Sequence, residues 1–331
     1  MEILRDTNFD FLGKKWPFII LSLVLMAMGL ISLWVKGGPR YGIDFKGGSL
    51  IRLKFNEPPR IDQIRATVSK VVPGGVNVQN FTDPASQNEV IIGTELKDER
   101  SLDTSQRAIL EALESRFGKN AFTVRSREVV GPKVGADLRN QAIKATLYAL
   151  AGMLVYIAFR FEWIYGAAAV IAVFHDTIIT IGLFSVFNEE ISLTVIAALL
   201  TLVGYSMNDT IVIFDRIREN LKILRREPLE SLMNKSVNQT LSRTVLTSGL
   251  TFLTCISLFL FGGAVLHGFA FALVCGILVG TYSSVFIASP IVLFWQNYKE
   301  GRKRTQPPPA PAVKPAPARP AAKKTSSKVT R

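Results

Sequence analysis

Long runs of apolar residues dominate the pattern of this chain. The first run, residues 16–35, is twenty residues long and contains no charge. A helix of that length crosses a hydrocarbon core of about 30 Å. Similar runs cover residues 139–160, 163–187, 191–214, 244–262 and 267–296. The pattern therefore predicts an α-helical polytopic membrane protein with six transmembrane helices.

Residues 36–138, between the first two runs, show the shorter periods of a folded soluble domain. Ile51, Leu53 and Phe55 alternate with charged residues, which is typical of a half-buried strand. Further strands are expected near residues 76–78, 90–92 and 122–124. Two helical faces are expected, one formed by Ile61, Ile64, Val68 and Val71 and the other by Ile109, Leu110, Leu113 and Phe117. The order β-α-β-β-α-β predicts a ferredoxin-like α+β domain.

The distribution of basic residues predicts the orientation. The net charge is +13, and many of the basic side chains lie beside the apolar runs and in the C-terminal tail. The connection 215–243 contains seven Lys and Arg residues, whereas positions 188–190 contain none. By the positive-inside rule we expect residues 1–15, this connection and the C-terminus in the cytoplasm, and the soluble domain in the periplasm. The first run ends in Trp34-Val-Lys36, which does not resemble a signal-peptide cleavage site.

The connection and the tail differ in pattern. Pro228 can begin a helix whose apolar residues share one face, and we expect that face to lie on the membrane or against a partner. These residues are Leu229, Leu232, Met233 and Val237. Residues 297–331 are basic and rich in Pro, so we expect a disordered cytoplasmic tail. The tail is expected to contact anionic lipid or ribosomal RNA at most, and otherwise to be only solvated.

Several classes of function are disfavoured. The two cysteines and two histidines are too scattered for a zinc site, and we expect no metal, no cofactor and no enzymatic activity. The segment ending at Asn208 lacks the last glycine of a nucleophile elbow. Ser206-Met-Asn-Asp209 lacks the Gly-x-Gly-Asp motif of membrane aspartyl proteases. Because the basic charge is explained by orientation, nucleic acid is not an expected partner.

Ionisable residues inside the apolar runs are the candidates for function. A charged side chain in a membrane helix costs several kcal/mol, so it needs a partner or a role. Asp209 lies about five residues, or about 8 Å, from the expected cytoplasmic end of its run. Arg243, at the start of the next run, is its natural counter-ion. The alternatives are a packing contact of Asp209 with Asn208 or Ser206, and an ordinary anchoring role for Arg243.

Two further groups of residues remain open in their role. His175 and Asp176 lie together in the third run, where they form either a proton relay or an anchor between helices. The segment containing Asp44, Phe45, Gly47 and Gly48 stands between the first run and the soluble domain. Its glycines favour a turn that leads into the first strand.

Five ordered motifs in this plan resemble the SecF family, the smaller subunit of the SecD-SecF complex of bacterial protein export, which is related to the RND transporter superfamily. The resemblance extends from about residue 10 to about residue 300. The motifs are Gly42-Ile-Asp-Phe-Lys-Gly-Gly48, Gly131-Pro-Lys-Val-Gly135, Phe174-His-Asp176, the segment from Gly204 to Asn220, and Asn238-Gln-Thr-Leu-Ser-Arg-Thr244.

The resemblance implies a multi-pass protein of the bacterial cytoplasmic membrane that uses the proton gradient to assist preprotein translocation. The implied partners are SecD, the SecYEG channel, the preprotein and, indirectly, the SecA ATPase. Asp209 matches the family's essential membrane carboxylate and Arg243 the motif arginine, and SecD is expected to contribute a further carboxylate. Two alternatives stay open, an RND-like exporter of lipids or small molecules and a structural scaffold of the translocon.

Overall fold

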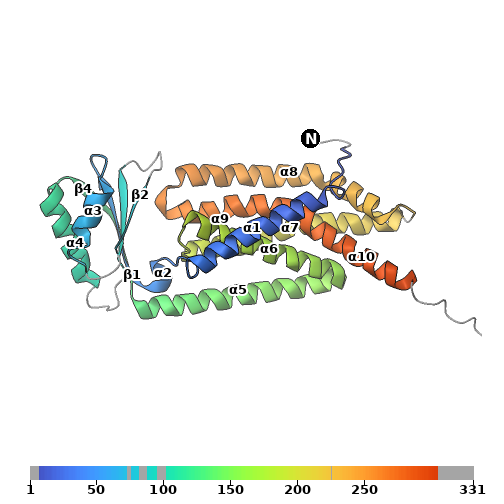
Figure 1. The fold of residues 1–331 in the computed structure, drawn as a ribbon, viewed down its shortest axis with the longest axis horizontal. Coiled ribbons are helices and arrows are strands. Elements are labelled where there is room, and N and C mark those ends of the chain that lie inside the picture. Colours follow the sequence, from blue (N-terminus) through green and yellow to red (C-terminus); the bar gives the residue numbers. More distant parts are fainter. Residues whose placement is uncertain (1–6, 73–75, 82–87, 95–101, 225, 305–331) are drawn as a thin grey trace, which may run out of the picture. The chain divides into compact units, whose positions relative to one another are not determined.

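The computed structural model describes residues 7–72, 76–81, 88–94, 102–224 and 226–304 (Figure 1). The described residues as far as Trp295 form one compact unit. The last helix, α10, ends at Arg304, so it includes the first eight residues of the segment 297–331 expected to be disordered. The rest of that tail lies outside the described residues.

Five stretches of helix in the described residues are long and apolar enough to cross a membrane. Their apolar character follows directly from the long runs in the sequence. The helices are α1 (Lys15–Val35), α6 (Trp163–Phe187), α7 (Leu193–Ile223), α8 (Leu229–Phe261), and the C-terminal series of α9 (Gly263–Ser283), a π-helical turn (Ser284–Ala288) and α10 (Ser289–Arg304).

The sixth expected span coincides with a helix, α5 (Pro132–Arg160), which has 29 residues. Residues 145–159 of α5 contain no charge, although the helix is not among the five stretches found in the described residues. Charged residues recur in its first half. These are Lys133, Asp137, Arg139 and Lys144. The crossing of the membrane by this helix therefore remains a prediction.

The segment between α1 and α5 contains a four-stranded sheet, and its strands and helices follow the predicted order. The sheet order is β2-β3-β1-β4, and each neighbouring pair is antiparallel. The short helix α2 (Ile43–Lys46) precedes the sheet. The elements are β1 (Gly48–Phe55), α3 (Ile61–Val68), β2 (Val76–Phe81), β3 (Glu89–Thr94), α4 (Leu102–Phe117) and β4 (Phe122–Val130).

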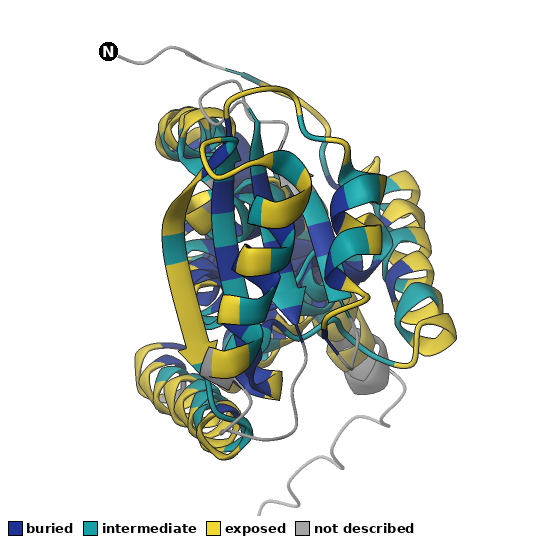
Figure 2. Cartoon of the chain, turned by 90° about the vertical axis from the view of Figure 1, so that its left-hand side faces the viewer, coloured by how far each residue is buried: buried dark blue, intermediate teal, exposed yellow. Residues whose placement is uncertain are grey.

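One face of the sheet carries the core of this domain. Ile51, Leu53 and Phe55 of β1 are buried in one cluster with residues of α3 and α4, as their alternation predicts. Figure 2 shows the two helices in front of the buried strands. The predicted face of α3 is correct except at its end, where Val72 is buried and Val71 is 37% exposed. The difference arises because α3 ends at Val68 and the chain then turns.

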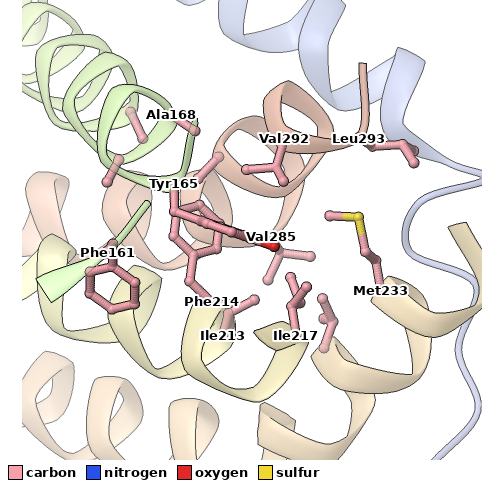
Figure 3. Close-up of a cluster of buried hydrophobic side chains, with 14 of the residues drawn as sticks. Phe161, Tyr165, Ala168, Ile213, Phe214, Ile217, Met233, Val285, Val292 and Leu293 are labelled. Atoms are coloured by element: carbon pink, nitrogen blue, oxygen red, sulfur yellow. The ribbon is translucent and has the colours of Figure 1, made fainter. Parts of the chain in front are cut away.

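A second core joins α7, α8 and the C-terminal helices (Figure 3). Leu232, Met233 and Val237 of α8 are buried in it. The expectation that this apolar face lies on the membrane surface or against a partner is therefore wrong. The physical reason is that α8 is one continuous helix of 33 residues, so the face belongs to its first turns and packs inside the chain.

Candidate functional site

Asp209 lies on α7 and is 3% exposed. Its Oδ2 atom accepts a hydrogen bond of 2.8 Å from the hydroxyl of Ser248 on α8. A buried carboxylate needs such donors, because a single buried charge without partners costs several kcal/mol. The bond therefore couples the ionisation of Asp209 to the contact between α7 and α8.

Arg243 lies on α8, five residues before Ser248, and is exposed. Its charge is close enough to attract the Asp209 carboxylate. Within the described residues, however, no direct ion pair joins the two side chains. The structure thus brings the two predicted residues onto neighbouring helices and places Ser248 in direct contact with the carboxyl.

Asp176 lies on α6, is 1% exposed and is the centre of a second polar cluster. Its Oδ2 atom accepts hydrogen bonds from Ser206 of α7 at 2.5 Å and from Ser283 of α9 at 2.9 Å. Its Oδ1 atom lies 2.8 Å from Nδ1 of His175. These contacts connect three helices at one carboxyl group.

The two residues that the sequence suggested as packing partners of Asp209 do not serve as such. Ser206 is bonded to Asp176, and Asn208 is exposed, so neither makes the packing contact considered for Asp209. Sequence reasoning missed Ser248 and Ser283. Hydroxyl residues inside apolar runs often bond across helices, and that was the available signal. Many similar hydroxyls in these helices, such as Ser257, bond to their own helix instead.

The junction between α1 and the sheet is held by glycines. Gly47 and Gly48 have φ values of 77° and 143°, which side-chain-bearing residues rarely adopt. A Cβ atom at Gly47 would lie 2.6 Å from Cα of Pro132 at the start of α5, and one at Gly48 would clash with the carbonyl of Thr94. The expectation of a turn into the first strand is confirmed, and close packing against α5 is an additional requirement.

Asp44 and Phe45 connect this junction to the helix that carries Asp209. Oδ2 of Asp44 accepts a hydrogen bond of 2.9 Å from the backbone N–H of Leu193, the first residue of α7. Phe45 is 4% exposed and packs edge-on against Tyr41. A carboxylate at a helix N-terminus is stabilised by the helix dipole. A movement of α7 would therefore act directly on the junction.

Glu190 forms a further contact between the sheet and the helices. It lies between α6 and α7, receives a hydrogen bond of 2.8 Å from Asn77 of β2, and pairs with Arg40 at 3.3 Å. Burial raises the pKa of Glu190 above its ordinary value of 4.5, and the charges of Arg40 and Lys46 oppose part of that shift. Protonation of Glu190 is thus linked to the docking of β2.

The described residues contain no group of three or more His, Cys, Asp or Glu side chains that could hold a metal ion. The polar centres of the helical part are carboxyl, imidazole, hydroxyl and guanidinium groups. In such surroundings the carboxyl and imidazole groups can bind and release protons, and all four kinds of group can form interhelical hydrogen bonds.

Two family profiles match the chain. The family described as "Protein export membrane protein SecD/SecF, C-terminal" matches residues 109–298, which include Asp176, Asp209 and Arg243. The "SecD/SecF GG Motif" matches residues 31–59, which include the junction at Gly47 and Gly48.

Curated relatives agree with these profiles. The chain is 45% identical to "Protein translocase subunit SecF" of Koribacter versatilis, with 94% of this chain and 97% of the relative covered. It is 46% identical to the protein of the same name in Calditerrivibrio nitroreducens, with 91% and 98% covered.

A solved structure agrees as well. The crystal structure of SecDF from Thermus thermophilus, a translocon-associated membrane protein, matches with a TM-score of 0.77 and 39% identity. The match covers 90% of this chain and 40% of the SecDF chain, so this chain spans less than half of that protein. On these matches, the chain belongs to the SecF family of protein translocase subunits.

Proposed function

We propose that this protein is an accessory subunit of the Sec translocon that uses the proton-motive force to assist preprotein translocation across the bacterial cytoplasmic membrane. The observation that carries the proposal is the buried Asp209 carboxyl, bonded to Ser248 of the neighbouring helix and close to the charge of Arg243. A buried carboxyl in a membrane helix is a functional-site hypothesis by default, and proton transfer is a common role for it. The relatives' names supply the translocation context.

Protonation would change the contact between α7 and α8. The Asp209 carboxylate accepts the Ser248 hydroxyl and is attracted by Arg243, whereas the neutral acid loses most of that attraction. Moving one charge across a potential of 100 mV supplies about 2.3 kcal/mol. That energy is enough to change the equilibrium constant between two conformations by at least about tenfold.

The junction offers a route from α7 to the sheet. The start of α7 is bonded to Asp44, and the backbone N–H of Gly42 donates to the carbonyl of Ile191 at 2.9 Å. The chain passes from there through Gly47 and Gly48 into β1. A displacement of α7 on protonation would therefore move the sheet domain, which we propose as the part that acts on the preprotein.

The proposed architecture has six membrane spans, with α5 as the second span and both termini in the cytoplasm. A helix of 29 residues, as α5 is, extends about 44 Å, which exceeds the hydrocarbon thickness. The antiparallel sheet order β2-β3-β1-β4 supports a ferredoxin-like fold for the domain, which we place in the periplasm. The excess of basic residues in 215–243 supports that orientation.

The proposed principal partner is SecD, because the SecDF chain is longer than this chain and contains a region similar to it. SecD would supply the further carboxylate of the proton path. We further propose that the complex works with the SecYEG channel after SecA has delivered the preprotein. The protein itself has no enzymatic activity in this proposal and requires no cofactor.

Substitution of Asp209 by Asn tests this function. The amide keeps the size and the ability to accept from Ser248 but cannot exchange a proton. Membrane vesicles that contain the partner subunit and the channel should lose proton-dependent stimulation of translocation, while insertion and complex assembly are retained. Retained stimulation would favour the structural scaffold instead.

A further inference from the structure

A second titratable pair lies deeper in the helical part, and the proposed proton path does not use it. His175 and Asp176 are neighbours on α6, with 5% and 1% of their surfaces exposed. Ser206 and Ser283 both donate their hydroxyl hydrogens to Oδ2 of Asp176. Two hydroxyl donors from two other helices therefore converge on one oxygen of this carboxyl group.

The hydrogen-bond pattern assigns the tautomer of His175. Nδ1 of the ring lies 2.8 Å from Oδ1 of Asp176, and it acts as the donor when the carboxyl is ionised. A neutral imidazole carries one N–H, so Nε2 then presents a lone pair. Nε2 is buried and has no hydrogen-bond partner within the described residues. It is a basic atom with an unused acceptor site in the protein interior.

Aromatic and hydroxyl groups surround the His175–Asp176 pair. Tyr282 of α9 faces the ring edge-on with centroids 6.0 Å apart, and its hydroxyl is bonded to Ser22 of α1 at 3.0 Å. On α7, Ser206 bonds to Asp176, and Asp209 follows three residues later on the same helix. In the described part of the chain, no Lys or Arg forms an ion pair with Asp176.

We propose that His175 and Asp176 form a second proton-binding site, and that the proton enters at Nε2 of His175. The lone pair of Nε2 takes up the proton and forms an imidazolium, while Nδ1–H stays bonded to the Asp176 carboxylate. The net charge of the pair changes from −1 to 0, and no covalent bond between heavy atoms changes.

A purely structural anchor does not require this arrangement. An unsatisfied buried polar atom costs about 1–3 kcal/mol, so the unused nitrogen of His175 is a cost that a purely structural anchor does not need. This cost is explained if Nε2 serves to bind a proton. The buried position of Nε2 further implies that the site is occluded in this conformation.

The second site is coupled to the first through α7. Ser206, which bonds to Asp176, and Asp209 are three residues apart and therefore neighbours on one helix. A proton bound at His175 lowers the total negative charge of the region that contains the Asp176 and Asp209 carboxylates. This inference rests on the proposed proton-driven function, which it extends from one proton-binding group to two within the same chain.

The low histidine content permits a direct test. The chain has only two histidines, His175 and His267. In a His267→Gln variant of the full chain, labelled with 15N-histidine by itself and then combined with unlabelled partner subunit, the imidazole signal reports on His175 alone. We expect a neutral Nδ1–H tautomer at high pH and a one-proton titration of Nε2 as the pH falls.

Three variants in that background separate the explanations. Asp176→Asn should move the titration to lower pH, because the carboxylate that accepts from Nδ1–H is lost. Ser283→Ala should move it to higher pH, since the carboxylate keeps more negative charge for the imidazolium. His175→Asn keeps a donor in place of Nδ1 but no second nitrogen, so folding should persist while proton-dependent translocation falls.

The proposal is overturned if the His175 signal stays neutral across the pH range of the folded protein. It is equally overturned if Asp176→Asn leaves the titration unchanged. The titration is independent of translocation and should persist in Asp209→Asn. Loss of the titration with a functional Asp209 would therefore reject this site alone, whereas stimulated translocation in Asp209→Asn would reject the proposed function alone.

Discussion

The hydroxyl of Ser248 on α8 donates a hydrogen bond of 2.8 Å to the carboxyl of Asp209 on α7. It is the only hydrogen bond that this carboxyl side chain makes among the described residues. Arg243 lies farther away on α8 and acts through its charge. The immediate partner of the candidate proton carrier is therefore a small hydroxyl group, and the arginine sets the wider electrostatic surroundings.

Replacing Ser248 by Ala should weaken the contact between α7 and α8. The Asp209 carboxyl would lose its hydrogen-bond donor, at a cost of about 1–3 kcal/mol in stability. Thermal unfolding in detergent should detect the loss, and proton-dependent translocation should decrease with it. Ser257→Ala is the matched control, because Ser257 lies on the same helix, is exposed and bonds only to the carbonyl of Leu253. Equal behaviour of the two variants would contradict the role of Ser248.

Replacing Gly47 by Ala should impair the junction by sterics. The new Cβ would approach Cα of Pro132 to 2.6 Å, and the positive φ adds strain of about 1–2 kcal/mol. Gly37→Ala has a similar φ of 73° but meets no atom within 4 Å, so it suffers the strain without the clash. We expect the first variant to be less stable in thermal unfolding and less active in translocation than the second. Similar losses in both would show that backbone strain alone is responsible.

The docking of the sheet domain should depend on pH through Glu190. Because burial raises the pKa of Glu190, the docked state binds the proton more tightly than a released state in which the side chain is solvated. Docking is therefore most stable below the ordinary pKa of 4.5 and weakens as the pH rises through the raised value. Distances between spin labels at positions 119 and 187 measure this equilibrium.

The Glu190→Gln variant is the control for that measurement. It keeps an oxygen that can accept the hydrogen bond from Asn77 but has no titrating group. Its label distances should not change over the same pH range. A pH dependence equal to that of the unmodified protein would assign the effect to another group.

Replacing Met233 by Ala should destabilise the helical core. Met233 of α8 is fully buried in one core with residues of α7 and the C-terminal helices. Truncation of a buried Met typically costs about 2–5 kcal/mol. Ser231→Ala, at an exposed position on the same turn, should have little effect on thermal unfolding. If Met233 instead faced the membrane surface or a partner, its truncation would leave the stability of the isolated chain nearly unchanged.

Local pattern predicted much of the fold. The alternation at Ile51, Leu53 and Phe55 and the helical spacing around Ile109 and Leu113 depend on neighbours along the chain, so the order of the sheet domain could be inferred from the sequence. The apolar face of α8 was also identified correctly from its spacing. Which surface that face contacts depends on residues such as Ile217 and Val292, and no local pattern contains that information.

The candidate site could be predicted only in part for the same reason. Asp209 and Asp176 were identifiable because a carboxyl within an apolar run is costly. Their partners lie on other helices, 39 and 107 residues away for Ser248 and Ser283. One serine among many inside apolar runs carries no distinctive signal. The assignment of Ser206 to Asp176 depends on how α6 and α7 pack.

The central claim is that Asp209 exchanges the protons that drive translocation. Its most direct test compares Asp209→Asn with Thr201→Ala, an exposed position on the same helix whose hydroxyl bonds to its own backbone. Both variants are reconstituted with the partner subunit and the channel in vesicles with an imposed proton gradient. We predict that Thr201→Ala retains proton-stimulated translocation and that Asp209→Asn loses it. Full stimulation in Asp209→Asn would show that Asp209 does not carry the driving protons.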